Sequence, residues 1–171
     1  FFLEMMRDAS SQTFALSCVI KILSAPLNTA EHERVSKAVG GKFLGCIKTF
    51  IRDNTEEEFE MELQLLRAVG EICLVSKKHQ RLLIDAGVYQ VIVSLLQLPM
   101  EEEKGLQERQ GKLVNECLGA LYYVLIGCKK NKTAFEENVG YDRFTEVLKE
   151  VAPKVADQCA VVNKLFDMLV E

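Results

Sequence analysis

Apolar residues recur along this chain with the spacing of an α-helix. Most windows place them three and four residues apart, and the strict alternation typical of a strand is rare. The chain has only 3 prolines and 10 glycines, so few positions interrupt a helical backbone. The sequence therefore predicts an all-α protein.

One apolar helical block occurs three times, in steps of 53 and 52 residues. Its copies are Ala15, Leu16, Val19 and Ile20, then Ala68, Val69, Ile72 and Cys73, then Ala120, Leu121, Val124 and Leu125. A polar segment, a glycine and a second amphipathic helix follow each copy, and the glycines are Gly40, Gly87 and Gly140. Such repetition is typical of an α-solenoid, whose units pack on their neighbours. We expect one domain with units at about 10–53, 55–98 and 111–152 and a partial unit at 156–171.

The repeat is longer than the roughly 40–47 residues of armadillo and HEAT units. Part of the excess lies in 99–111, a polar and acidic stretch that begins at Pro99 and ends at Gly111. We expect this stretch to be an exposed insertion. It is either a solvated connection or a segment that a partner or regulator recognises.

Composition narrows the class of protein. Among the 171 residues, 49% are hydrophobic and 27% are charged, which favours a folded globular chain over a disordered one. The net charge of −4 provides no bulk attraction to nucleic acid, so we expect none as a partner. The chain begins without Met and ends inside an apolar helical pattern. We therefore expect it to be a piece of a longer protein.

The sequence offers little chemistry. The six cysteines form no C-x-x-C pair and sit in apolar helical stretches, as free thiols in a reducing cytoplasmic setting do. The only two histidines, His32 and His79, lie in polar stretches, so we expect both at the surface. Metalloprotease, phosphate-loop and hydrolase motifs do not occur. We expect no enzyme, no cofactor and no metal site.

The segment Ile84-Asp85-Ala86-Gly87-Val88 resembles the armadillo repeat, and Asn138-Val139-Gly140 resembles it more loosely. The resemblance implies a right-handed α-solenoid of about three to four armadillo- or HEAT-like units. It also implies a concave surface lined by the helices after the glycines, which would bind a protein or peptide. The candidate partner-binding residues on those helices are Lys42, Lys48, Tyr89, Gln90, Ser94, Asp142, Arg143, Glu146 and Lys149.

The run from Asn131 to Tyr141, with Lys132, Phe135 and Gly140 at fixed spacing, is similar to the armadillo-like regions of BEACH-domain proteins. Among these, it looks most like the autophagy-linked type with FYVE and WD repeats. That family implies a large intracellular scaffold in vesicle traffic and selective autophagy, and it carries over no catalytic residue. An alternative is a module that regulates small GTPases, because formins and GTPase-dissociation stimulators also use armadillo folds.

Two lysine pairs stand at equivalent positions of the repeat. We place them near the C-termini of the long helices, where cations complement the helix dipole. Stacked units would instead gather them into a basic ridge that attracts an acidic peptide or an anionic membrane surface. The ridge consists of Lys77, Lys78, Lys129, Lys130 and Lys132.

Overall fold

The computed structural model describes Ala15, Cys18, 56–75, 77–85, 87–97, 104–151 and Asn163. These residues form helices and no strand, which confirms the all-α prediction. The helices are α4 (Glu56–Val75), α5 (Lys77–Asp85), α6 (Val88–Leu96), α7 (Lys104–Leu125), α8 (Lys129–Asn138) and α9 (Tyr141–Val151). The unit expected at 10–53, with Lys42 and Lys48, and the partial unit at 156–171 lie almost wholly outside the described residues.

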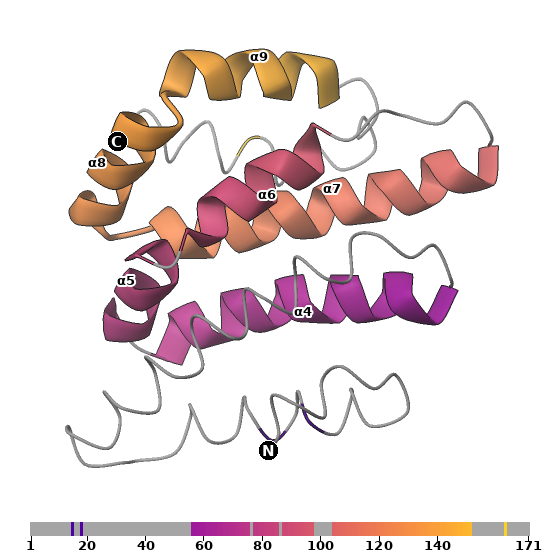
Figure 1. Ribbon diagram of the computed structural model, residues 1–171, viewed down its shortest axis with the longest axis horizontal. Coiled ribbons are helices and arrows are strands. Elements are labelled where there is room, and N and C mark those ends of the chain that lie inside the picture. Colours follow the sequence, from indigo (N-terminus) through magenta and orange to yellow (C-terminus); the bar gives the residue numbers. More distant parts are fainter. Residues whose placement is uncertain are drawn as a thin grey trace.

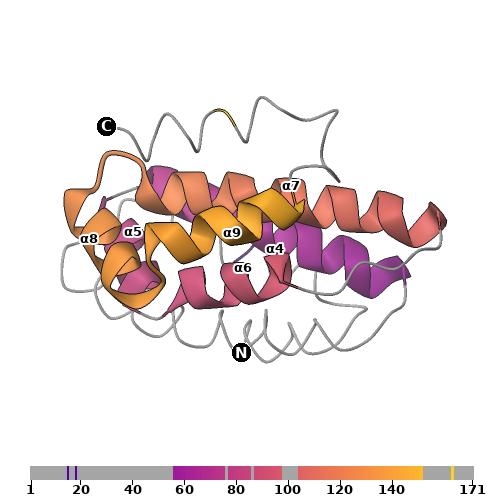
Figure 2. The same ribbon diagram turned by 90° about the horizontal axis from the view of Figure 1, so that it is seen from above.

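The described helices form two equivalent units, each a long helix followed by two short ones. The long helices α4 and α7 run side by side in the same direction, and α6 and α9 return toward the opposite end (Figure 1). The short helices α5 and α8 pack on each other at one end of the stack. Seen from above, α9 lies over the first unit (Figure 2). Each helix of the first unit thus contacts its equivalent in the second, which is the arrangement of an α-solenoid.

Two of the repeated glycines form the turn between the short helix and the helix that follows it. Gly87 has a φ of 83° and Gly140 a φ of 80°, values that side chains with a Cβ rarely adopt. The N–H of Gly87 donates to Ile84 O at 2.8 Å, and that of Gly140 to Phe135 O at 3.3 Å. The predicted helix breaks at these two glycines are therefore confirmed, with a left-handed turn as their physical cause.

The core follows the inner faces of α4, α6 and α7 and continues into α8 and α9. Its centre between the units is Phe135, which is fully buried and meets Phe144 edge to face at 5.3 Å between ring centroids. Tyr89 of α6 contacts the same ring at 6.1 Å. One aromatic cluster thus joins the first unit to the second, and such pairs add to the gain from burial alone.

The stretch expected as an exposed insertion at 99–111 is helical in its second half. Residues 104–111 form the first two turns of α7, although Gly105 and Gly111 lie within them. The remaining residues include good helix formers, and Lys112 pairs with Glu108 at 3.3 Å one turn away. Packing of α7 on α4 stabilises the helix further, which outweighs the cost of the two glycines.

Candidate interaction site

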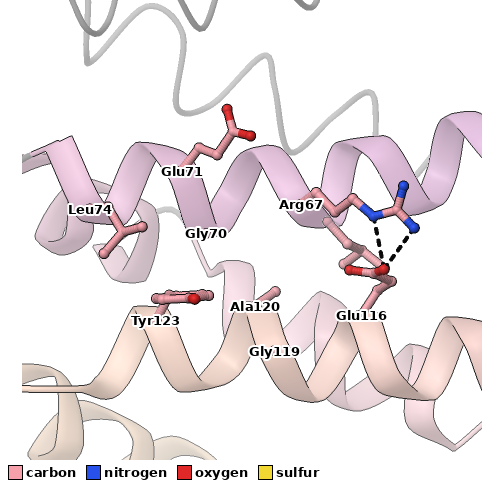
Figure 3. A pocket seen from close by; sticks show the side chains of 9 residues that line it. Arg67, Gly70, Glu71, Leu74, Glu116, Gly119, Ala120 and Tyr123 are labelled. Atoms are coloured by element: carbon pink, nitrogen blue, oxygen red, sulfur yellow. Dashed lines mark hydrogen bonds and ion pairs between the residues drawn. The ribbon is translucent and has the colours of Figure 1, made fainter. Parts of the chain in front are cut away.

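A hollow of about 250 Å³ opens on the surface between the long helices α4 and α7 (Figure 3). Small residues form its floor, since Gly70 of α4 faces Gly119 and Ala120 of α7. A Cβ added to Gly119 would meet no atom within 4 Å, so the space above this glycine is open. The absence of a side chain at Gly119, beside the small residue Ala120, leaves the hollow between two helices that otherwise pack closely.

The ring of Tyr123 forms one wall of the hollow. It lies against the backbone of Gly70, where a Cβ would come within 2.8 Å of Tyr123 Cδ2. Tyr122 meets the same ring edge to face, with centroids 5.4 Å apart. The ring is therefore held in place from two sides.

An ion pair closes the other end of the hollow. Arg67 of α4 contacts Glu116 of α7 through both Nε and Nη2, each at 2.8 Å. Both contacts fall on one carboxylate oxygen, Oε1 (Figure 3). The hydrogen bond to Glu116 raises the pKa of Arg67 further, so the guanidinium stays charged.

An exposed apolar side chain lines the hollow. Leu74, at the C-terminal end of α4, is 68% exposed and points toward Tyr123 (Figure 3). Ile126 occupies the equivalent position 52 residues later and is 39% exposed. Large exposed apolar side chains beside a concavity are typical of protein-interaction surfaces.

The hollow lies on the long helices, whereas the sequence analysis expected the binding surface on the helices after the glycines. Tyr89 of α6 is only 5% exposed, so its assignment as an outward residue is wrong. It faces inward because α6 packs on α5, α7 and α9 at once. Gln90 and Ser94 are exposed on the same helix. The four candidates on α9 are also exposed: Asp142, Arg143, Glu146 and Lys149.

The candidates on α9 are partly engaged with one another, since Lys149 Nζ donates to Glu146 Oε1 at 2.7 Å. On α6, Ser94 Oγ donates to the backbone oxygen of Gln90 at 2.8 Å. Their exposure is as expected, and whether any of them binds a partner stays a prediction.

The lysine pairs lie in the first turns of α5 and α8 and not at the ends of the long helices. The helix-dipole explanation is therefore wrong, because the positive end of the dipole lies at a first turn. Instead, Lys77 Nζ donates to the backbone oxygen of Gly127, just after α7. The two helices that carry these lysines are neighbours at one end of the stack (Figure 1), and whether the lysines form a basic ridge there stays a prediction.

The surface position expected for His79 is wrong, because its side chain is buried. His79 is the equivalent, 52 residues earlier, of Asn131, which is also fully buried. Asn131 Nδ2 donates to Val124 O at 2.8 Å and to Gln80 O at 3.4 Å. Asn131 thereby links the second unit to the backbone of the first.

Gln80 holds the backbone at the end of α7, where Tyr123 lies. The sequence analysis did not single out this residue. Its buried side-chain amide donates to Tyr123 O and to Ile126 O, both at 2.9 Å. These carbonyls lie at the C-terminal end of α7, where backbone acceptors lack partners within the helix. The first unit thus anchors the backbone of the residue whose ring forms the wall.

Two of the described cysteines, Cys73 and Cys117, are not activated as nucleophiles. Burial raises the pKa of the Cys73 thiol to about 12, and it raises the pKa of Cys117 as well. A nucleophilic cysteine needs the opposite shift. The four described cysteines are free, and no group of three metal-ligating side chains comes together among the described residues. None of the helices that the structure describes is long and apolar enough to cross a bilayer.

A buried carboxyl group stands apart from the hollow. Glu62 of α4 is 7% exposed, and its Oε1 has no hydrogen-bond partner among the described residues. Burial raises the pKa of Glu62 to about 7. Its charge also raises the pKa of Cys117, so the two side chains lie close together between α4 and α7.

Comparison with known proteins gives one match. A family model described as the Neurobeachin alpha solenoid region matches residues 1–171. No curated protein and no solved structure gives a significant match. The match agrees with the stacked helical units and supports the resemblance to the solenoids of a BEACH-type family. The chain therefore belongs to the Neurobeachin alpha solenoid region family.

Proposed function

We propose that this chain is a non-catalytic protein-interaction scaffold of a large protein in membrane traffic or selective autophagy. A partner docks in the hollow between α4 and α7. The observation that carries this proposal is Leu74, a large apolar side chain left 68% exposed beside a concave surface. Burial of such a side chain by a partner is favourable, because apolar area leaves water.

Solenoids suit this role because each added unit extends a continuous surface. The trafficking assignment rests on the resemblance of the run from Asn131 to Tyr141 to the autophagy-linked FYVE type of BEACH-domain proteins. The docking assignment rests on the hollow and is independent of that resemblance.

The test is proximity labelling in cells with two variants of one residue. Gly119→Leu fills the open space of the hollow, whereas Gly119→Ala adds only a methyl group. Both changes replace a glycine inside a helix, so neither is expected to weaken the fold. A vesicle-traffic or autophagy partner labelled by the Gly119→Ala chain and lost from the Gly119→Leu chain supports the proposal.

Equal labelling by both variants would overturn docking in the hollow. Loss of partners that belong to other processes would keep the docking and overturn the trafficking assignment.

Direct binding of an anionic membrane surface is a second candidate, favoured by the exposed lysines of α5 and α8. Lys77, Lys78, Lys129 and Lys130 all lie in first turns, on two neighbouring helices at the same end of the stack. Each lysine near an anionic surface contributes about 1 kcal/mol of attraction, which salt screens.

Sedimentation with phosphatidylserine vesicles, in low and in high salt, separates this candidate from protein docking. Membrane binding predicts sedimentation that falls with salt and falls again when Lys129 and Lys130 are both changed to Glu. Reversal of Arg143 and Lys149 on α9 is the control with the same change in charge. Equal effects of the two double variants would contradict a specific role of the lysines.

A further inference from the structure

We infer that the hollow between α4 and α7 receives a short segment of a partner protein in which one apolar side chain is flanked by lysine or arginine. This inference rests on the proposed docking function and specifies the chemistry of the partner. Size, apolar lining and charge each contribute to the argument.

The hollow is large enough for one side chain of a partner protein. Its volume of about 250 Å³ lies below the range of roughly 300–1,000 Å³ that pockets for small molecules occupy. It is open to solvent above Gly119, so a side chain carried by another protein can enter from outside. An apolar anchor is therefore a better occupant than a cofactor.

The lining favours an apolar anchor. Leu66, Gly70 and Ala120 form an apolar floor, and Tyr123 presents the face of its ring beside Leu74 (Figure 3). The wall is held in place, because the side-chain amide of Gln80 donates to the backbone oxygen of Tyr123. Because the hollow is already formed before the partner binds, less conformational entropy is lost on binding.

The described charges around the hollow are mainly negative. Glu71 and Glu116 line it, and Glu60 lies close enough to Arg67 to influence that residue's pKa. Arg67 is the single cation among the described lining residues, and its charge is already engaged by Glu116. An acidic segment would meet the two lining carboxylates, Glu71 and Glu116, whereas a basic segment gains attraction to them.

The carboxylates lie on both sides of the hollow. Glu116 precedes Gly119 by about one turn of α7, and Glu71 extends from the outer side of α4, away from α7 (Figure 3). Both contacts of Arg67 use Oε1 of Glu116, which leaves Oε2 for a second cation. A partner segment that runs from α7 to α4 would therefore have Glu116 near the residues before its apolar side chain and Glu71 near the residues after it.

Three fluorescent decapeptides test this inference by polarisation with the 171-residue chain. One carries a central leucine flanked by lysines, one has glutamates in place of the lysines, and one has serine in place of the leucine. We expect the lysine–leucine peptide to bind best and the other two to bind at least about tenfold more weakly. Added salt should weaken the lysine–leucine peptide, because the carboxylates are exposed.

Two variants locate the binding. Gly119→Leu should abolish binding of the lysine–leucine peptide, and Gly119→Ala should preserve it. Glu71→Lys should weaken binding of the lysine–leucine peptide and strengthen binding of the glutamate peptide. Glu137→Lys on α8 makes the same change of charge at an exposed position away from the hollow, and it should have little effect.

The outcomes separate the inference from the proposed function. Equal binding of the lysine and glutamate peptides, both blocked by Gly119→Leu, would overturn the basic partner and keep docking in the hollow. Equal effects of Glu71→Lys and Glu137→Lys would also overturn it. Self-association of the chain that Gly119→Leu removes would assign the hollow to a second copy and overturn a partner segment. Absence of peptide binding, together with unchanged cellular labelling by Gly119→Leu, would overturn both.

Discussion

Gly70 of α4 lies directly against the ring of Tyr123 of α7, so closely that a Cβ at Gly70 would come within 2.8 Å of Tyr123 Cδ2. The glycine has no side chain to hold the two helices apart, and the aromatic ring fills the space. Forty-nine residues after Gly70 along the chain, Gly119 of α7 leaves the space above it open. Gly70 therefore allows the two helices to pack closely, whereas Gly119 keeps the hollow accessible.

Replacement of each glycine by alanine should change stability in opposite directions. Gly119→Ala is expected to stabilise the chain by about 0.5–1 kcal/mol, because glycine inside a helix loses more backbone entropy on folding. Gly70→Ala gains the same preference but pushes the methyl group into Tyr123, a clash that costs about 1–3 kcal/mol. Urea unfolding followed by circular dichroism measures both. Equal stabilisation by the two changes would contradict the close contact.

The amide of Gln80 should be important for the joint between the units. Gln80→Met keeps the approximate size and removes both hydrogen bonds to the end of α7. Loss of the hydrogen bonds to these two partly buried carbonyls costs about 1–3 kcal/mol, so we expect the free energy of unfolding to fall by this amount. Gln90→Met, at an exposed position of α6, is the control and should stay within about 0.5 kcal/mol of the parent. Similar values for the two variants would be evidence against the anchoring role.

Glu62 should make stability depend on pH between the ordinary carboxyl pKa of 4.5 and its raised pKa of about 7. Below pH 4.5 the carboxyl is protonated in the folded and unfolded states, so it imposes no penalty. As the pH rises toward 7, only the unfolded state ionises, and the folded state loses about 3 kcal/mol relative to it. Stability from this group is therefore greatest in acid and lost toward neutral pH.

Glu62→Gln removes this ionisation. Thermal unfolding of the parent and of Glu62→Gln should give similar midpoints near pH 4.5 and a clear advantage of the variant at pH 8. Glu71→Gln, on the exposed side of the same helix, should show no such divergence. Parallel profiles for the parent and Glu62→Gln would mean that Glu62 is solvated or paired in the folded chain.

The sequence predicted the repeat well because its signals are local. Helical spacing identified the helices, and the step of 52 residues correctly relates Leu74 to Ile126 and Lys77 to Lys129. Gly87 marked a turn because a left-handed backbone favours glycine. These features depend on the backbone and on near neighbours, so a single sequence contains them.

The faces of the short helices could not be predicted in the same way. Seven of the nine residues of α6 are buried, Tyr89 among them, because three other helices pack around it. His79 lies in a polar stretch, and its side chain is still buried. Exposure at these positions is decided by tertiary packing, which periodicity along one helix does not report.

The hollow was also missed, although the sequence contained a signal for it. Gly70 and Gly119 each stand inside a strongly apolar helical pattern, where glycine costs up to about 1 kcal/mol and often has a packing reason. The step of 52 residues does not relate these two glycines to each other. Only the alignment of α4 beside α7 brings them together at one hollow.

Site-specific photo-crosslinking in cells tests the central claim most directly. A photoreactive amino acid is placed at Leu74, the exposed apolar residue that lines the hollow, and, as a control, at Thr133, which is exposed on α8. If the hollow docks a partner, illumination will give a discrete protein adduct from position 74 that position 133 does not give. No adduct from position 74, or the same adducts from both positions, would contradict the claim that this hollow is the binding site of the scaffold.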